Sequence, residues 1–233
     1  MDNKYIIILF NGFGSSKIFW NYAFEDMPEL RKIDFLDKLT EIGKVYKFNQ
    51  SFFNINYYST PNNKKEKILW KKIYIKYKPH SSDIDFNLDE LDYKNICDKT
   101  YDKVKFKYGQ DKKYIVIGHS YGAGLALLFS KLHKDECILC CCIDNPPYVL
   151  SFFNKYNDKD NKSILEKYKN NEELKKSLKI IKNSDNVKEK NKEIDDIYKL
   201  IGYRSCQDRI KYYDDKLYIP TIFCRAYYTK PKK

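Results

Sequence analysis

Residues 113–124 read Lys-Tyr-Ile-Val-Ile-Gly-His-Ser-Tyr-Gly-Ala-Gly, and this stretch decides the fold. Its first part, Lys113 to Ile117, contains the aromatic and β-branched run Tyr-Ile-Val-Ile and predicts a buried strand. The small and apolar residues from Tyr121 to His133 predict a helix packed against a sheet. The sequence therefore predicts a strand, a tight turn and a helix in immediate succession.

Two glycines flank Ser120 in the turn, in the pattern G-x-S-x-G. Between a buried strand and a helix, this pattern is typical of a nucleophile elbow, in which strained backbone presents a serine hydroxyl at a helix N-terminus. A Cβ on Gly118 or Gly122 is expected to collide with the neighbouring strand or helix. The sequence thus makes Ser120 the candidate nucleophile, and the alternative is an ordinary turn that happens to contain serine.

A second glycine loop, Asn-Gly-Phe-Gly-Ser-Ser at residues 11–16, follows the apolar run Tyr5–Phe10, which predicts another buried strand. The chain has only eight glycines, yet five of them fall in the two loops: Gly12, Gly14, Gly118, Gly122 and Gly124. A plain glycine turn ahead of a helix is the alternative interpretation of residues 11–16.

Taken together, the two loops resemble those of the α/β-hydrolase superfamily, which includes serine hydrolases, lipases and esterases. Its members typically place H-G-x-G-S-S after the strand that corresponds to Tyr5–Phe10. The resemblance implies that the backbone N–H groups of Phe13 and Tyr121 form an oxyanion hole, in a loop shaped by Gly12 and Gly14. Asn11 stands where the family usually has His, a change that main-chain donors tolerate.

Strands that alternate with helices predict an α/β fold, an α/β-hydrolase-like doubly wound, mostly parallel sheet of about five strands. The other expected strands are 44–53, 137–143 and 216–225, and the other expected helices are 26–42 and 89–108. Residues 64–78 fit either a hairpin or a short helix. Residues 155–200 have apolar positions at helical spacing and predict an inserted helical cap. We therefore expect a core at 1–150, a cap at 151–212, and the last core strand and tail at 213–233.

Asp144 ends the expected strand 137–143, at the carboxyl edge of the sheet where such sites form. The resemblance allows it as the acid of a catalytic triad, and a turn-capping role before the two following prolines is the alternative. In the family an acid, a strand and the catalytic histidine follow the strand that matches 216–225, but residues 226–233 contain no Asp, Glu or His. The chain is therefore expected to stop before that histidine. A shortened reading frame of a once-complete hydrolase is one explanation.

Three histidines are candidates for the missing base. His119 lies inside the elbow and is expected to point away from Ser120. His133 lies at the far end of the expected helix, roughly 20 Å from Ser120 at 1.5 Å per residue. His80 lies in a loop that could reach the site, so the base stays unassigned.

A net charge of +12 comes almost entirely from Lys, alongside many Asn, Ile and Tyr residues, as AT-rich coding DNA produces. A nucleic-acid partner is therefore disfavoured, although the lysines and aromatics of residues 64–78 could form an anion-binding patch. No run approaches the roughly 20 apolar residues that cross a bilayer. With no signal peptide recognised at the N-terminus, we expect an intracellular, cytoplasmic protein.

Four of the seven cysteines crowd one expected strand: Cys137, Cys140, Cys141 and Cys142. Neighbouring strand residues point to opposite faces, so these thiols cannot all bind one metal ion. They fit small buried hydrophobic residues in a reducing compartment, and neither a metal nor a cofactor is expected.

The expected function is hydrolysis of a carboxylic ester or thioester through Ser120, with a small-molecule acyl substrate. The alternative is a non-catalytic α/β-hydrolase-fold protein that binds an apolar ligand or a protein partner beneath the cap. The sequence leaves the oligomeric state open.

Overall fold

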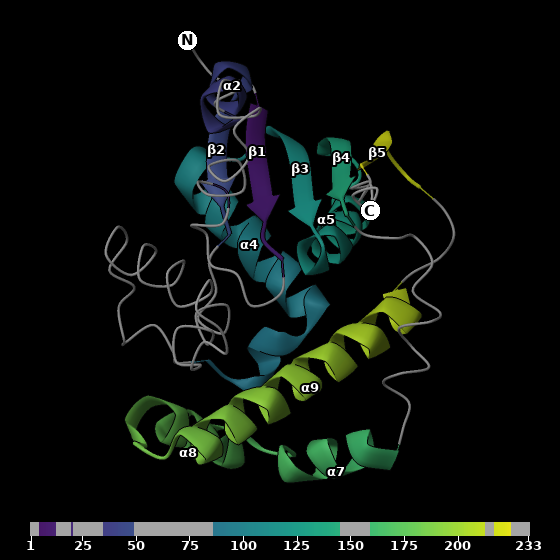
Figure 1. Ribbon diagram of the computed structural model, residues 1–233. Helices are drawn as coiled ribbons and strands as arrows, with labels where there is room; N and C mark the ends of the chain where they lie inside the picture. Colours follow the sequence, from purple (N-terminus) through teal and green to yellow (C-terminus); the bar gives the residue numbers. More distant parts are fainter. Residues whose placement is uncertain are drawn as a thin grey trace, which may run out of the picture.

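The computed structural model describes residues 5–12, 20, 35–48, 86–144, 159–212 and 217–224. Five strands in these ranges form one sheet in the order β2-β1-β3-β4-β5, and all four pairings are parallel (Figure 1). The strands are β1 (Tyr5–Phe10), β2 (Lys44–Lys47), β3 (Lys113–His119), β4 (Cys137–Ile143) and β5 (Thr221–Cys224). The predicted α/β class with a parallel sheet is confirmed.

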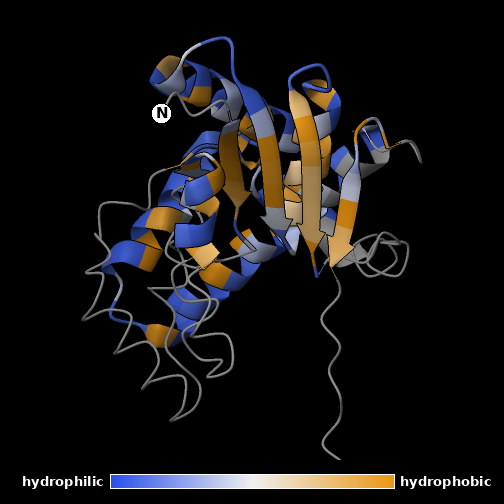
Figure 2. Cartoon of the chain, turned by 90° about the horizontal axis from the view of Figure 1, so that it is seen from above, coloured by the Kyte–Doolittle hydropathy of each residue, from blue (hydrophilic) through white to orange (hydrophobic). Residues whose placement is uncertain are grey.

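Helices cover both faces of the sheet. Those that pack on the strands are α2 (Phe35–Ile42), α4 (Tyr93–Tyr108) and α5 (Tyr121–Leu132). The other described helices are α7 (Lys159–Lys167), α8 (Asn171–Asn183), α9 (Val187–Tyr212) and a short 3₁₀ helix η3 (Leu88–Leu91). On β1, Ile6 and Ile8 pack in the same core as α4 and α5, while Ile7 and Leu9 pack with Leu39 of α2. Because side chains alternate along a strand, covering both faces requires a strand that is apolar throughout. Figure 2 shows the resulting hydrophobic strands between helices with hydrophilic outer turns.

The cysteines of β4 follow the same alternation. Cys140 and Cys142 lie in the core beside α5, whereas Cys141 packs on the other face of the sheet. The prediction that these thiols point to opposite sides is confirmed.

A topological switch point lies between β1 and β3. From β1 the chain passes through α2 to β2 on one side, whereas β3 lies on the other side of β1 and leads through α5 to β4. In open parallel sheets, ligands bind where connections diverge in this way, at the carboxyl ends of the strands. The ends of the two strands adjoin there, since Phe10 pairs with Gly118. Both glycine loops therefore start from the same edge of the sheet.

The helices α7, α8 and α9, called the three-helix segment below, come between β4 and β5 in the chain and lie beyond the carboxyl ends of the strands (Figure 1). The Lys167 ammonium lies 2.8 Å from carboxylate oxygens of both Glu193 and Asp196, which joins α7 to α9. The Glu193 carboxylate also accepts hydrogen bonds from Tyr168 and from Ser177 of α8. One buried polar network thus fixes the three helices to one another.

The structure differs from the predicted boundaries at several points. The predicted helix 89–108 is interrupted at Asp92, where extended backbone separates η3 from α4. The predicted strand 44–53 ends at Lys47, and residues 49–53 lie outside the described residues. The last strand is shorter than expected, with only 221–224 paired to β4. The helical region predicted to end at residue 200 continues to Tyr212 in α9.

Candidate active site

Ser120 is the single residue between β3 and α5. Its backbone has φ 52° and ψ −115°, a conformation that residues with a Cβ rarely adopt. Two hydrogen bonds hold it there: its N–H donates to the carbonyl of Ile143 at 2.9 Å, and its carbonyl accepts from the N–H of Ala123 at 3.0 Å. The Ser120 side chain is half-buried and makes no capping hydrogen bond to α5.

The two glycines beside Ser120 are each in contact with main chain. A Cβ on Gly118 would lie 2.1 Å from the carbonyl oxygen of Gly122 and 2.6 Å from the Cα of Ala123. A Cβ on Gly122 would lie 2.3 Å from the carbonyl oxygen of Phe10 and 2.4 Å from that of Asn11. No side-chain rotation can relieve these contacts, because a Cβ is fixed by its own backbone and would meet main-chain atoms. The first turn of α5 therefore packs directly against the ends of β1 and β3.

Asn11 fixes the start of the first glycine loop. Its side chain is buried, accepts a hydrogen bond from Trp20 Nε1 at 2.9 Å, and donates one to the carbonyl of Phe48 at 3.3 Å. A buried amide must be paired, and this one joins the end of β1 to the residue that follows β2. The sequence reasoning gave Asn11 no such role, although a polar residue directly after a fully buried strand was a usable signal.

Asp144 and His119 lie at the ends of the neighbouring strands β4 and β3. Asp144 has φ 52°, which Asp tolerates, and its N–H donates to the carbonyl of Cys224 at 2.7 Å. Burial lowers the pKa of His119, and the Asp144 carboxylate opposes that shift without cancelling it. The Nδ1 atom of His119 lies 2.8 Å from the position that a Cβ on Gly12 would occupy, so the ring lies against the first glycine loop.

Tyr121, the first residue of α5, is held from α4. The Tyr93 hydroxyl donates to the carbonyl of Tyr121 at 3.2 Å, and the two rings meet edge to face at 4.9 Å. The N–H of Tyr93 in turn donates to the carboxylate of Asp208 on α9. Arg204, also on α9, bridges to Asp92 at 2.9 Å. The three-helix segment is thereby bonded to the start of α4, directly behind the elbow.

Several of the predicted site residues lie outside the described residues: Phe13, Gly14, His80 and the lysine-rich stretch 64–78. Of the predicted residues that are described, Gly12, Gly118, Ser120, Gly122, Tyr121 and Asp144 meet at one edge of the sheet. His133 ends α5 at the opposite end from Ser120, where its ring stacks on Tyr101 at 3.8 Å.

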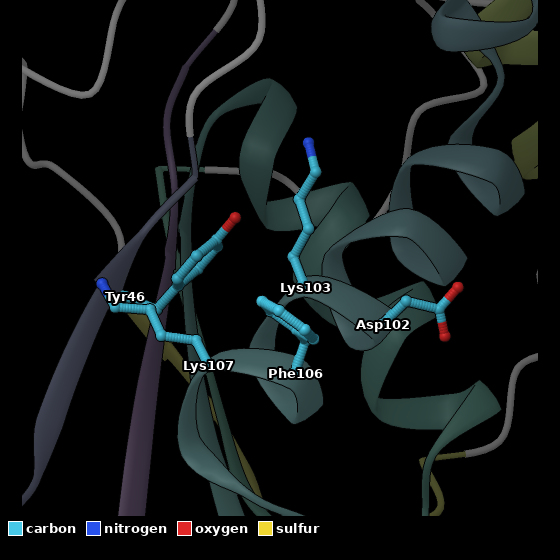
Figure 3. Close-up of a pocket in the computed structure, with 5 residues that line it drawn as sticks. All are labelled: Tyr46, Asp102, Lys103, Phe106 and Lys107. Carbon is cyan, nitrogen blue, oxygen red and sulfur yellow. The ribbon is translucent and has the colours of Figure 1, made fainter.

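A surface hollow between β2 and α4 is lined by Tyr46, Asp102, Lys103, Phe106 and Lys107 (Figure 3). Phe106 is 94% exposed, so the hollow is an open depression. It lies along the C-terminal half of α4, whereas Tyr93 at the start of that helix contacts the elbow. None of the residues lining it belongs to the elbow or the first glycine loop.

No three His, Cys, Asp or Glu side chains among the described residues lie close enough together to hold a metal ion. No helix in the described ranges is long and apolar enough to cross a membrane.

Comparison with known proteins gave matches only among solved structures. No protein-family profile and no curated protein matches the sequence. An esterase from a marine microorganism has 15% identity and a TM-score of 0.41, covering 94% of this chain and 76% of its own. An extracellular α/β-hydrolase from a Paenibacillus species has 17% identity and a TM-score of 0.34, covering 66% of this chain and 52% of its own.

A peroxisomal α/β-hydrolase from Saccharomyces cerevisiae has 15% identity and a TM-score of 0.34, and the match covers 89% of this chain. The chain spans 55% of that protein, so it matches about half the length of two of these three structures. The strand order, the strained serine and the glycine contacts come from the chain itself. The chain has an α/β fold, with Ser120 at the switch point of a five-stranded parallel sheet.

Proposed function

We propose that the chain is a serine hydrolase that cleaves a carboxylic ester or thioester through Ser120. The observation that carries the proposal is the backbone of Ser120, which has φ 52° while its hydroxyl caps nothing in α5. A serine before a helix usually gains about 1 kcal/mol by capping it. A residue held in strained backbone costs about 1–3 kcal/mol. A serine that is strained and has no capping bond fits a nucleophile better than a structural turn residue.

In the proposed reaction, Ser120 Oγ attacks the acyl carbonyl carbon and its proton passes to a base. The carbonyl oxygen becomes an anion, which the N–H of Tyr121 stabilises at the start of α5, and the N–H of Phe13 is the second donor by resemblance. Each such donor lowers the barrier by about 3–4 kcal/mol. The first turn of α5 carries no acidic residue that would oppose the anion. Collapse of the intermediate expels the alcohol or thiol, and water then releases the acid from Ser120.

We assign the triad acid to Asp144, because it ends the strand next to β3 and directly follows the residue that accepts the Ser120 N–H hydrogen bond. His133 does not suit the role of base, since it lies at the far end of α5, and His119 is expected by resemblance to point away from Ser120. His80 is therefore the histidine to test.

The substrate in this proposal is a small acyl compound bound between the elbow and the three-helix segment. That segment would act as a cap, in a chain divided into a core at 1–150, a cap at 151–212 and a last strand and tail at 213–233. Its support is the bonding of α9 to the start of α4 by Arg204 and Asp208. Caps in this position cover the carboxyl edge of the sheet and exclude water from the reacting carbonyl.

The test is covalent labelling of the folded full-length chain with a fluorophosphonate probe, which reacts with activated serine hydroxyls. We expect labelling of the native chain and none of Ser120→Ala. Ser130→Ala is the matched control, because Ser130 lies in α5 and bonds only to the carbonyl of Leu127. His80→Ala should lose labelling as well if His80 is the base.

Absence of labelling in the folded native chain, or labelling that persists in Ser120→Ala, contradicts the hydrolase proposal. In the first case the alternative is a non-catalytic protein that binds an apolar ligand or a protein partner. Binding of a fluorescent fatty-acid analogue by the native chain would support that alternative.

A further inference from the structure

Two cysteines face each other across the pairing of β4 with β5. The Sγ atoms of Cys141 and Cys224 lie 3.9 Å apart. Cys224 is exposed and Cys141 is half-buried, whereas the other cysteines with described side chains are buried: Cys97, Cys137, Cys140 and Cys142. Among these six, Cys141 and Cys224 are the one pair of neighbouring thiols in which solvent can reach a member.

The two residues are diagonal neighbours on one face of the sheet. Cys141 pairs with Ile222, and Ile143 pairs with Cys224. Diagonal neighbours have Cα atoms about 7–8 Å apart, and disulfides prefer about 4.4–6.8 Å. Forming an S–S bond of about 2.05 Å from a separation of 3.9 Å therefore requires one strand to shift along the other.

The strand β5 can make that shift at small cost. It has four residues, of which three are exposed, and within the described ranges its ladder is formed with β4 alone. A short edge strand with few buried side chains gives up little packing when it slides. The buried strand β4, with β3 on its other side, stays in place.

We propose that Cys141 and Cys224 form a reversible disulfide by exchange with a small-molecule disulfide such as oxidised glutathione. The thiolate of Cys224 attacks one glutathione sulfur, which breaks the glutathione S–S bond, forms a mixed disulfide and releases one glutathione thiolate. The thiolate of Cys141 then attacks the Cys224 sulfur and expels the second glutathione thiolate. The two protons lost by the protein thiols pass to the two glutathione thiolates, so two protein thiols are oxidised and one glutathione disulfide is reduced.

The order of these steps follows from exposure. Burial, and next the neighbouring Cys224, raises the pKa of the Cys141 thiol, so Cys141 is the poorer first nucleophile. Cys224 meets the oxidant from solvent. Thiols can reopen the bridge by the reverse exchange, because Cys224 is exposed to solvent.

The bridge acts on the edge of the sheet that carries the candidate site. The carbonyl of Cys224 accepts the hydrogen bond from the N–H of Asp144. The carbonyl of Ile143, the residue before Asp144, accepts the hydrogen bond from the N–H of Ser120. A shift of β5 is therefore transmitted first to Asp144. Formation of the bridge itself does not depend on the proposed hydrolase function.

The experiment treats the folded full-length chain with oxidised glutathione, alkylates the remaining thiols under denaturing conditions, and analyses non-reduced proteolytic peptides by mass spectrometry. We expect one linked pair of peptides that contains Cys141 and Cys224, lacks two hydrogens, and separates after dithiothreitol. Cys140→Ser is the matched control and should keep the link, because its thiol faces Cys142 on the other side of the sheet. Cys141→Ser should lose the link and leave Cys224 as a glutathione mixed disulfide.

Three results overturn the proposal. They are the absence of any link in the folded native chain, a link that persists in Cys141→Ser, and a native chain that stops at the mixed disulfide on Cys224. Circular dichroism of the native chain and of each variant establishes that all of them are folded before oxidation.

Discussion

Replacing Ser120 by glycine should stabilise the protein relative to replacing it by alanine. The backbone of Ser120 has φ 52° and ψ −115°, which glycine adopts without steric cost and which any residue with a Cβ adopts only under strain. Alanine keeps the Cβ and therefore keeps the strain. Neither substitution removes a helix cap, because the Ser120 hydroxyl makes no capping hydrogen bond.

The size of the effect follows from two opposing terms. Relief of backbone strain contributes about 1–3 kcal/mol to the free energy of unfolding. The greater freedom of glycine in the unfolded chain offsets about 0.5–1 kcal/mol of that gain. Ser120→Gly should therefore be more stable than Ser120→Ala by about 1 kcal/mol, which corresponds to roughly 2–4 °C in Tm for a chain of this size.

Ser130 supplies a control of opposite sign. It lies inside α5, where glycine destabilises a helix relative to alanine by about 1 kcal/mol, and both substitutions remove the same hydrogen bond to Leu127. Urea unfolding followed by circular dichroism compares the four variants. If Ser120→Gly is no more stable than Ser120→Ala while the Ser130 pair behaves as expected, the backbone of Ser120 is not strained.

Three further changes test the packing of the site and of the three-helix segment. Gly122→Ala places a Cβ about 2.3 Å from the carbonyl oxygen of Phe10, so urea unfolding should show a loss of about 3 kcal/mol, and an unchanged stability would contradict the tight turn. Lys167→Met leaves the carboxylates of Glu193 and Asp196 without their cation, and calorimetry should show a loss of about 2 kcal/mol, moderated because the Lys167 side chain is 32% exposed. Burial raises the pKa of Glu193, but the hydrogen bond from Lys167 and other contacts outweigh it and lower the pKa overall. This contribution to stability is present at neutral pH and is lost as the pH falls through the lowered pKa of Glu193, so Tm should drop less steeply with acid in Glu193→Gln than in the native chain.

The sequence was sufficient for elements whose signal is local. The run Tyr5–Phe10 forms a strand with the predicted bounds. Side chains alternate along a strand, so six consecutive apolar residues are buried only when helices cover both faces of the sheet. Helix boundaries were predicted less well, since tertiary contacts set them. The chain is extended at Asp92 where the carboxylate of Asp208, 115 residues further along, accepts the N–H of Tyr93. No local pattern around residue 92 contains that partner.

The candidate site divides in the same way. The pattern around Ser120 predicted a turn in which glycines meet main chain, and the contacts of Gly118 and Gly122 agree with that prediction. The position of Asn11 after a buried strand could indicate a paired polar side chain, but not its partner, because the carbonyl of Phe48 lies 37 residues away. Proximity of Asp144 to His119 depends likewise on the register of β3 against β4.

The hydrogen bonds behind the elbow connect it to the most distant part of the chain. Asp208 on α9 accepts the N–H of Tyr93, and the Tyr93 hydroxyl donates to the carbonyl of Tyr121, the residue that follows the strained serine. Tyr121 is the first residue of α5, so its position sets the direction of the N–H groups in the first turn of that helix. The Ser120 side chain caps none of these N–H groups. A shift of α9 would therefore reach the first residue of α5 through two hydrogen bonds. Under the proposed hydrolase function, this coupling would let the proposed cap also align the proposed oxyanion donors.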